Sequence, residues 1–402
     1  MRLIHTADWH IGQQFFGYDR RTEHQAFFEW LKRQLQEQEA DVLLVAGDVF
    51  DSPNPSAESQ KMYYRFLREV TAVNPALQIV IIAGNHDSAA RLEAPNPLLE
   101  EMRISVKGVV KRTPEGTIDF RDLLIPLKQG EETKAWCMAV PYLRQGDYPE
   151  AESYGAGIAA MYAALKEEAD KLRTPEQAVI AMGHLQASGS DLSADDRSER
   201  IIIGGLEAVP PEIFDAGIAY TALGHLHKAQ RVSGQDWVRY SGSPLPMSFA
   251  EKNYKQGVNL IELEGNRLVA IERLAFEPPV RLLSLPDEPL PLAEVLAVLE
   301  ELPDGTPAED SPYLEVKVRV TEPEPSLRYQ VEQLLSGKAV RLGPMREFRP
   351  GVQREERVVT LEDLQTISPL ELAEDVFRQR YQTGLPEHLK KLLTRVIQKT
   401  EL

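Results

Sequence analysis

The chain has 402 residues, of which 43% are hydrophobic and 27% charged, and its formal net charge is −17. This composition is that of a globular protein, and no apolar run approaches the roughly 20 residues that a membrane-spanning helix needs. The negative charge excludes a protein that holds nucleic acid by a basic surface alone. The single cysteine, Cys137, excludes a disulfide framework and is expected in the core. Because Arg2 to His5 predict a strand and not a signal peptide, we expect a cytoplasmic protein.

From residue 3 to about 275, short apolar runs alternate with amphipathic helical patterns, which is typical of an α/β protein. The runs predict strands at residues 3–7, 42–46, 79–83, 136–140, 179–182, 218–223 and 237–240. A hairpin is predicted at 258–274, with its turn at Gly265. Helices are predicted at 22–38 and 56–70, where apolar side chains share one face. We expect these helices to cover a sheet.

A group of prolines then interrupts the pattern. It consists of Pro278, Pro279, Pro286, Pro289 and Pro291. Proline-rich segments suit semi-rigid connectors, so we expect a first domain over residues 1–277 and a small α+β domain over 278–345. Within the small domain the sequence predicts a helix at 292–302, a strand at 314–320 and a helix at 326–335.

The end of the chain has a different character. Residues 338–357 carry six basic side chains against three acidic ones, and they are either a solvated linker or a strip that contacts phosphate. We assign 346–365 as a basic linker. Residues 366–402 predict a pair of helices with apolar stripes, the first beginning at Ser368. The pair is too short to form its own core, so it packs on the rest of this chain or on a partner helix.

Polar residues follow several of the predicted strands directly. They are Asp8 and His10, Asp48, the run Asn85-His86-Asp87, His184, and the pair His225 and His227. Five of the eight histidines fall in these short motifs. In open α/β sheets, sites form at the carboxyl ends of strands, so these side chains are expected to converge. The glycines before them let the backbone turn sharply.

Carboxylate, imidazole and amide groups without thiolate suit manganese, iron or zinc. The candidate metal ligands are Asp8, His10, Asp48, Asn85, His184, His225 and His227. These are too many for one ion with an open position. Two ions that share a bridging carboxylate fit better, and such a pair can neutralise phosphate oxygens and activate a water for in-line attack.

The order of these motifs along the chain resembles that of the metallophosphoesterase superfamily. The residue sequences in and around the motifs resemble those of the SbcD nuclease family within it. The motifs that carry the resemblance are His5–Gly12, Ala46–Asp51, Ala83–Ser88, Leu223–His227 and Tyr240–Pro244. They lie within residues 1 to about 250; beyond that, the resemblance rests on the order and length of the modules. It implies an αββα sandwich with a small α+β cap domain and a C-terminal helical pair.

The resemblance also implies two manganese ions that share Asp48. One would be held by Asp8, His10, Asp48 and His227, and the other by Asp48, Asn85, His184 and His225. His86 would be the catalytic histidine, with Asp87 as its orienting partner. For Asp51, Ser88 and Trp9, orienting and packing roles stay open.

By the same resemblance, the chain is expected to be a manganese-dependent exonuclease and endonuclease that cleaves double-stranded DNA ends and hairpins in repair, recombination and replication. It would act near the nucleoid as a homodimer within a heterotetramer. The SbcC ATPase, an SMC-like protein, would be its partner in that assembly and would dock on residues 366–402. The alternative is a phosphatase or small-molecule phosphodiesterase of the same superfamily.

Overall fold

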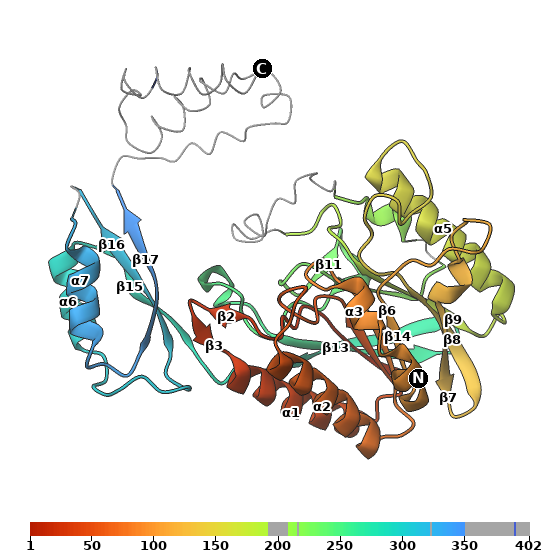
Figure 1. Ribbon diagram of the computed structural model, residues 1–402, viewed down its shortest axis with the longest axis horizontal. Helices are drawn as coiled ribbons and strands as arrows, with labels where there is room; N and C mark the ends of the chain where they lie inside the picture. Colours follow the sequence, from red (N-terminus) through yellow and green to blue (C-terminus); the bar gives the residue numbers. More distant parts are fainter. Residues whose placement is uncertain (192–207, 215–216, 322–323, 350–389, 391–402) are drawn as a thin grey trace. The chain divides into compact units, whose positions relative to one another are not determined.

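Two six-stranded sheets pack face to face in this computed structural model, which describes residues 1–191, 208–214, 217–321, 324–349 and 390 (Figure 1). The first sheet has the order β14-β13-β1-β4-β5-β6. Its parallel strands are β1 (Arg2–Thr6), β4 (Val42–Ala46), β5 (Gln78–Ile82) and β6 (Ile104–Lys107). The hairpin of β13 (Gly257–Glu264) and β14 (Arg267–Ala275) extends it, antiparallel to β1.

The second sheet has the order β11-β12-β10-β9-β8-β7. Its parallel strands are β8 (Glu132–Ala139), β9 (Ala178–His184), β10 (Tyr220–Gly224) and β12 (Gln235–Tyr240). The antiparallel strands β7 (Leu124–Gln129) and β11 (Gln230–Val232) lie at its edges. Every strand predicted in the first 275 residues is present, with ends that differ by a few residues.

Alternate residues of the strands fill the space between the two sheets. Leu44 and Val80 from the first sheet share this core with Ile180 and Ala222 from the second. Cys137 is fully buried there, as expected for a packing residue. Because both faces of the central strands are covered, these strands are almost continuously apolar. They therefore act as rigid supports for the residues that follow them.

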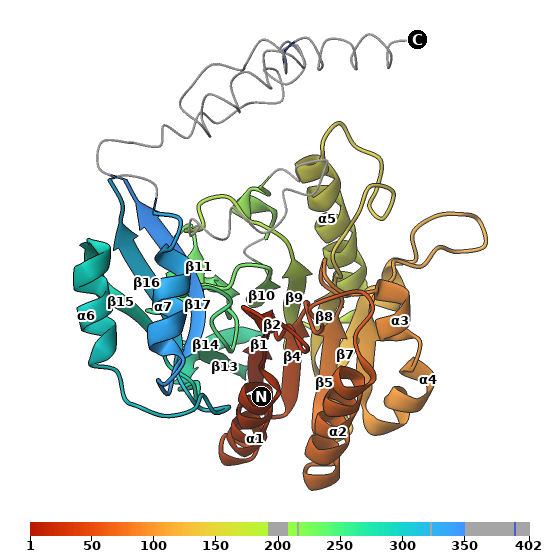
Figure 2. The same ribbon diagram turned by 60° about the vertical axis from the view of Figure 1, so that its left-hand side comes forward.

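Helices cover the outer faces of both sheets (Figures 1 and 2). Helices α1 (Arg21–Glu37) and α2 (Ala57–Val73) lie on the first sheet, and α5 (Tyr154–Leu172) lies on the second. Ser56 caps α2, because its hydroxyl accepts a hydrogen bond from the Ser59 amide at 3.1 Å. The expected αββα sandwich is confirmed.

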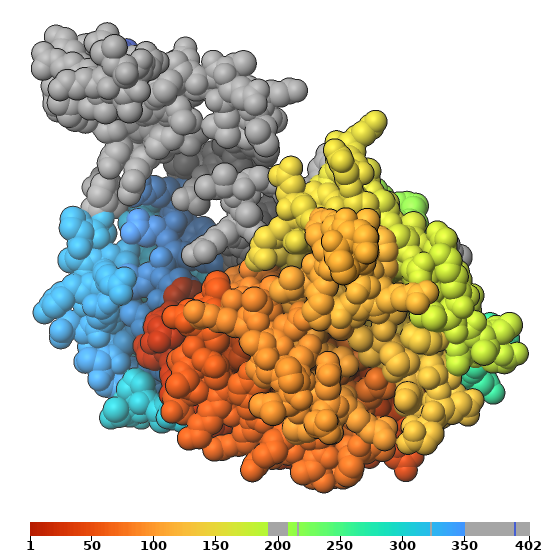
Figure 3. Space-filling model, turned by 45° about the vertical axis from the view of Figure 1, so that its right-hand side comes forward, coloured from red at the N-terminus to blue at the C-terminus, as the bar shows by residue number. Residues whose placement is uncertain are grey.

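Two short α-helices lie between β5 and β6. After β5 the chain forms α3 (Ala89–Glu93) and α4 (Asn96–Leu99). In Figure 3 the orange and yellow atoms of the segments from α2 to α5 form the surface on this side. Among the residues that the structure describes, no helix is long and apolar enough to cross a membrane.

The small domain is a three-stranded parallel sheet with two helices packed on it (Figure 2). The strands are β15 (Leu282–Leu290), β16 (Tyr313–Arg319) and β17 (Arg341–Phe348), and the helices are α6 (Leu292–Glu300) and α7 (Leu327–Leu335). The proline connector predicted here was wrong in part, because Pro286 and Pro289 lie inside β15. This strand is at the edge of its sheet, where a residue without an N–H group is tolerated.

The predicted basic linker also needs correction at its start. Strand β17 runs to Phe348, so Arg346 belongs to the sheet and its Nε donates to Glu315 at 2.7 Å. Arg341 is buried, and its guanidinium lies 3.8 Å from the centre of the Tyr313 ring. That side chain packs in the domain and cannot contact phosphate. The remaining linker and the helical pair at 366–402 lie outside the described residues, apart from Arg349 and Lys390.

The small domain contacts the sandwich through a group of aromatic side chains. Phe15, Phe249 and Tyr313 form a buried cluster with Val280. The Tyr313 hydroxyl donates to Glu23 at 2.8 Å. Residues Met1–Phe348 form one compact unit. The boundary at residues 277 and 278 stays a prediction.

Candidate metal centre

The parallel strands deliver all the predicted ligands to one edge of the sandwich. Asp8 and His10 follow β1, Asp48 follows β4, Asn85 follows β5, His184 ends β9, and His225 and His227 follow β10. Within each sheet these strands are parallel neighbours. Their carboxyl ends therefore meet, as predicted for a site in an α/β sheet.

The backbone at this edge is held in an uncommon conformation. Asp8, His10, Asp48 and His225 have φ angles of 54°, 46°, 50° and 99°. Such angles cost on the order of 1–3 kcal/mol each in residues other than glycine, and they persist only where the surrounding structure enforces them. Strain on four candidate ligands indicates that the fold gives up stability to aim these side chains inward.

Two glycines allow the strand ends to approach each other closely. A Cβ atom on Gly84 would lie 2.1 Å from Oδ1 of Asp48, and one on Gly224 would lie 1.9 Å from the Ala46 carbonyl oxygen. Any side chain at these positions would push apart strands β4, β5 and β10. The glycines of these motifs are thus required by close packing, in addition to the turns for which the sequence suggested them.

Asp48 contacts residues from both sheets. Its Oδ2 lies 3.2 Å from Nε2 of His184 and 3.6 Å from Nε2 of His10. Its Oδ1 accepts a hydrogen bond from the His86 amide at 2.9 Å. One carboxylate oxygen therefore faces two imidazole nitrogens that come from different strands. This is the geometry of a group that can bridge two cations.

Asn85 faces two further imidazoles. Its Oδ1 lies 2.9 Å from Nε2 of His184 and 3.1 Å from Nδ1 of His225. Nδ1 of His184 must donate to the Ala46 carbonyl oxygen, 2.8 Å away, because that oxygen can only accept. In the neutral ring, Nε2 then presents a lone pair to the oxygens of Asn85 and Asp48. Lone pairs that face each other in a buried site need a cation or a proton between them.

The Asp8 carboxylate also indicates that a cation or a proton belongs in this site. Its Oδ1 accepts from the His225 amide at 2.9 Å, whereas its Oδ2 is buried and accepts no hydrogen bond from the residues that the structure describes. A buried carboxylate oxygen without a partner is costly. Ligand atoms of Asp8, His10 and His227 lie within 4.8 Å of one another, and so do those of Asp8, Asp48 and His184. The residues present therefore fit divalent metal ions.

The pKa values of the carboxyl groups reflect this crowding. Burial raises the pKa of Asp8, even though His184 and His227 act in the opposite direction. Burial also opposes ionisation of Asp48, but the neighbouring His184 and His10 hold the pKa of that group well below its usual range. A carboxylate kept ionised inside a protein is suited to bind a cation.

His86 lies beside this group with its ring orientation fixed. Its Nδ1 donates to the Asp51 carbonyl oxygen at 3.0 Å, and its ring centre lies 4.8 Å from that of His10. Ligand atoms of His10, Asp48 and His86 also lie within 4.8 Å of one another. Because Nδ1 is engaged with the Asp51 carbonyl, a further partner of the His86 ring would have to meet Nε2.

The structure corrects the role expected for Asp87. Its carboxylate accepts hydrogen bonds from the backbone amides of Val49, Phe50 and Gly84, at 3.1, 2.9 and 2.9 Å. It thus joins the loops after β4 and β5, while the Asp51 carbonyl orients His86. Burial and the charge of Asp48 raise the pKa of Asp87 to about 6, against the effect of these amides.

The residues whose roles stayed open are now placed. Asp51 contributes its carbonyl to His86, and its carboxylate oxygen Oδ1 lies 3.4 Å from Nδ1 of His10. Trp9 is fully buried and packs edge-on against Phe28 and Phe66, so it is a core residue. Ser88 takes the position before the first residue of α3.

One buried residue of the site was not predicted. Glu251 lies 3.1 Å from Nδ1 of His227, although no strand precedes it. It is one of 62 acidic residues, and only the fold brings it to the site. No signal in the sequence distinguished it.

The comparisons with known proteins agree with this geometry. A family model described as calcineurin-like phosphoesterase matches residues 1–229, and one described as type 5 capsule protein repressor C-terminal domain matches residues 278–382. The SbcD subunit of the nuclease SbcCD from Rhodobacter capsulatus is 40% identical over 366 residues, which are 88% of this chain and 89% of that protein. The chain belongs to the SbcD nuclease family.

Other members of the SbcD family are more distant. The SbcD subunit of the Escherichia coli K12 nuclease SbcCD is 31% identical and covers 94% of this chain and 92% of its own length. The Bacillus subtilis protein of the same name is 30% identical, and the match covers 65% of this chain and 66% of that protein. Among solved structures, the nuclease MPE of Pseudomonas putida matches 46% of this chain and 64% of its own, with 16% identity and a TM-score of 0.20.

Membership of the SbcD family makes the chain a metal-dependent phosphoesterase of the nuclease type. The clusters of carboxylates and imidazoles at the strand ends are where the divalent metals of this superfamily can bind. The expected nuclease identity is confirmed at this level. The assignment of individual ligands stays a prediction.

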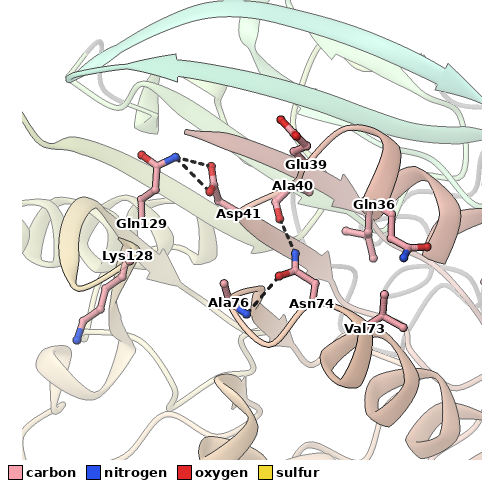
Figure 4. A pocket seen from close by; sticks show the side chains of 11 residues that line it. Gln36, Glu39, Ala40, Asp41, Val73, Asn74, Ala76, Lys128 and Gln129 are labelled. Atoms are coloured by element: carbon pink, nitrogen blue, oxygen red, sulfur yellow. Dashed lines mark hydrogen bonds between the residues drawn. The ribbon is translucent and has the colours of Figure 1, made fainter.

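A separate hollow of about 340 Å³ lies at the opposite edge of the sheets (Figure 4). Three of its polar side chains, Asp41, Asn74 and Gln129, bond to each other or to backbone. Gln129 donates to the Asp41 carboxylate, and Asn74 bonds both the Ala40 carbonyl and the Ala76 amide. None of these three described side chains has a buried polar atom that lacks a hydrogen bond, in contrast to Asp8 in the metal centre.

Proposed function

We propose that the chain is a manganese-dependent DNA exonuclease and endonuclease that hydrolyses phosphodiester bonds at double-strand ends and hairpins. It would serve DNA repair, recombination and replication at the bacterial nucleoid, in the cytoplasm. The observation that carries the proposal is the Asp48 carboxylate, whose Oδ2 faces Nε2 of both His10 and His184. That arrangement suits a pair of ions on one phosphate group.

In this proposal Asp48 would serve as a ligand to both ions. Asp8, His10 and His227 complete one set of ligands, and Asn85, His184 and His225 complete the other. When bound, divalent ions supply positive charge for the phosphate oxygens and lower the pKa of a water molecule. A mixed set of carboxylate, imidazole and amide oxygen is compatible with manganese. The acidic chain would thereby gain positive charge where the scissile phosphate lies.

His86 would act on the leaving oxygen. With Nδ1 bonded to the Asp51 carbonyl, Nε2 is the position from which the ring can hand over a proton. The imidazolium form donates that proton, and the ring then returns to its neutral tautomer without rotating. Asp87 would hold the loops of Asp48 and His86 together through backbone amides.

The partner in this proposal is the SbcC ATPase, an SMC-like protein. Its support is the shared name of the relatives, which are subunits of a complex called SbcCD. Residues 366–402 would dock this partner, and two nuclease chains would pair within a heterotetramer. Deletion of 366–402 should leave a metal-loaded nuclease that no longer copurifies with the ATPase. A truncated chain that still binds the ATPase at full strength would contradict this assignment.

The proposed reaction is tested by comparing substrates. The full chain with Mn²⁺ should cleave linear duplex and hairpin DNA, with and without the ATPase and nucleotide. A chromogenic phosphomonoester should be a poor substrate under the same conditions. Faster hydrolysis of the phosphomonoester than of DNA would instead support a small-molecule phosphatase.

A further inference from the structure

Glu251 is a buried carboxylate beside a candidate metal ligand. It ends the short 3-10 turn η4 (Phe249–Glu251), and it is 2% exposed. Its Oε1 lies 3.1 Å from Nδ1 of His227, and its Oε2 accepts the Met247 amide at 2.8 Å. The carboxylate can only accept, so Nδ1 of His227 carries the hydrogen.

We propose that Glu251 is a positioning residue that fixes the tautomer and orientation of His227 for metal binding. With the hydrogen held on Nδ1, Nε2 presents its lone pair toward the group of Asp8 and His10. A carboxylate on the far nitrogen also makes an imidazole a stronger ligand. This inference rests on the proposed metal centre, because it requires His227 to be a ligand.

The backbone of His227 is held by the same segment of chain. The Ser243 amide donates to the His227 carbonyl at 3.1 Å. Gly242 has a φ of 68°, and a Cβ on it would lie 2.6 Å from that carbonyl oxygen. The motif Tyr240–Pro244 thus fixes the backbone of His227 while Glu251 fixes its ring. This gives a role to a motif that the proposed reaction leaves unused.

The turn that carries Glu251 is itself anchored. Phe249 is buried in the aromatic cluster with Phe15 and Tyr313, so the position of the turn depends on the small domain. Burial of a carboxylate is costly unless its charge is compensated. An ion on Nε2 of His227 would polarise the ring and strengthen the hydrogen bond from Nδ1. The inference therefore predicts that Glu251 and the ion stabilise each other.

The test compares metal binding in Glu251→Gln and Glu315→Gln. Glu315 is a matched control, because it is also a buried carboxylate, but its partner is Arg346 in the small domain. Calorimetric titration of the full chain with Mn²⁺ should give two bound ions for the wild type and for Glu315→Gln. In Glu251→Gln one ion should bind about 10- to 100-fold more weakly, the usual effect of losing such a partner, while the other is unchanged.

A second readout begins with the wild type and does not depend on a variant at position 251 that folds. Nitrogen-15 NMR of labelled histidines in the metal-free wild type should show His227 with its hydrogen on Nδ1, the resonance being assigned from its loss in His227→Ala. In Glu251→Gln this preference should weaken. The NMR result also decides the matter if Glu251→Gln fails to fold.

The outcomes separate the two levels of the argument. A wild-type chain that binds fewer than two ions would overturn the proposed metal centre, and this inference with it. Two ions in the wild type, with unchanged affinities in a folded Glu251→Gln, would overturn the positioning role alone. His227 with its hydrogen on Nε2 in the wild type would do the same.

Discussion

Strand β4 carries an aspartate beyond each of its ends, and the two differ in what surrounds them. Asp41, before the strand, accepts the Arg2 amide at 2.8 Å and the Gln129 side chain at 3.2 Å. Asp48, after the strand, faces the imidazoles of His10 and His184. The same sheets thus present a hollow with paired polar groups at one edge and a strained, crowded, polar cluster at the other.

This difference shows which physical features indicate a site. The hollow beside Asp41 offers space, but the side chains of Asp41, Asn74 and Gln129 in it are already hydrogen bonded. The cluster around Asp48 instead combines left-handed backbone at Asp8 and His10 with a buried oxygen of Asp8 that accepts no hydrogen bond from the described residues. A buried carboxylate oxygen without a hydrogen bond therefore indicates the functional site here, whereas the presence of a hollow does not.

The largest expected effect separates the two aspartates directly. Asp48→Ala should abolish DNA cleavage and the binding of both ions, because its carboxylate is assigned as the bridge. Asp41→Ala should keep both ions and full activity, and lose about 1 kcal/mol of stability with its hydrogen bonds. Metal analysis and a nuclease assay on both purified variants make the comparison. Equal effects of the two substitutions would remove the distinction between the edges.

His86 tests whether the carboxyl edge contains a group that acts on the substrate in addition to the metal ligands. His86→Gln should retain both ions and lose cleavage by about 10²- to 10⁴-fold, the usual range for lost acid catalysis. The measurement is single-turnover cleavage together with metal content. Near-normal turnover in a metal-loaded variant would take His86 out of the reaction.

Close packing of the strand ends is tested with a pair of glycines. Gly84→Ala would place a Cβ atom 2.1 Å from Oδ1 of Asp48, whereas Gly337→Ala would meet nothing within 4 Å. We expect Gly84→Ala to lose about 1–3 kcal/mol of stability and to bind metal more weakly, as overpacking does. Gly337→Ala should behave like the wild type in thermal unfolding and metal titration. Similar results for both variants would show that the strand ends tolerate separation.

The smallest effect concerns pH. Burial would lower the pKa of His184, but the Asp48 carboxylate outweighs it and raises that pKa to about 9. The proton on His184 therefore stabilises the metal-free fold fully below pH 6.5, and this stabilisation is lost as the pH rises toward 9. Metal ions displace the proton, so metal affinity should increase over the same window.

Thermal unfolding with and without Mn²⁺ measures this effect. The gap between the two unfolding temperatures should widen from about pH 6.5 to about pH 8.5 in the wild type, and the widening should be absent in His184→Gln. A wild-type gap that stays constant over this range would show that no proton leaves His184 when metal binds.

Much of the fold and the candidate ligands could be predicted because both depend on local patterns. Short apolar runs mark the central strands, and a polar residue directly after a run marks a strand end. The carboxyl ends of parallel strands meet by geometry, so Asp8, Asp48 and His184 could be grouped from the sequence alone. The fold brings all seven candidates to one edge.

The elements that were missed depend on contacts between distant residues. Helix α5 was not predicted, since Gly155 and Gly157 interrupt its pattern; the structure uses Gly157 to admit the ring of Tyr148, which a Cβ would meet at 2.2 Å. Basic character could not show that Arg341 is stacked in the small domain. Glu251 lies on a turn 24 residues after His227. No apolar strand pattern directly precedes it, so the sequence did not indicate that it belongs to the site.

The central claim is that two divalent ions lie at the carboxyl edge with Asp48 between them. Anomalous diffraction from crystals of the full chain grown with Mn²⁺ tests it most directly. The account predicts two peaks, one beside Asp8, His10 and His227 and the other beside Asn85, His184 and His225, both in contact with the Asp48 carboxylate. A single peak, or peaks that do not share Asp48, would contradict it.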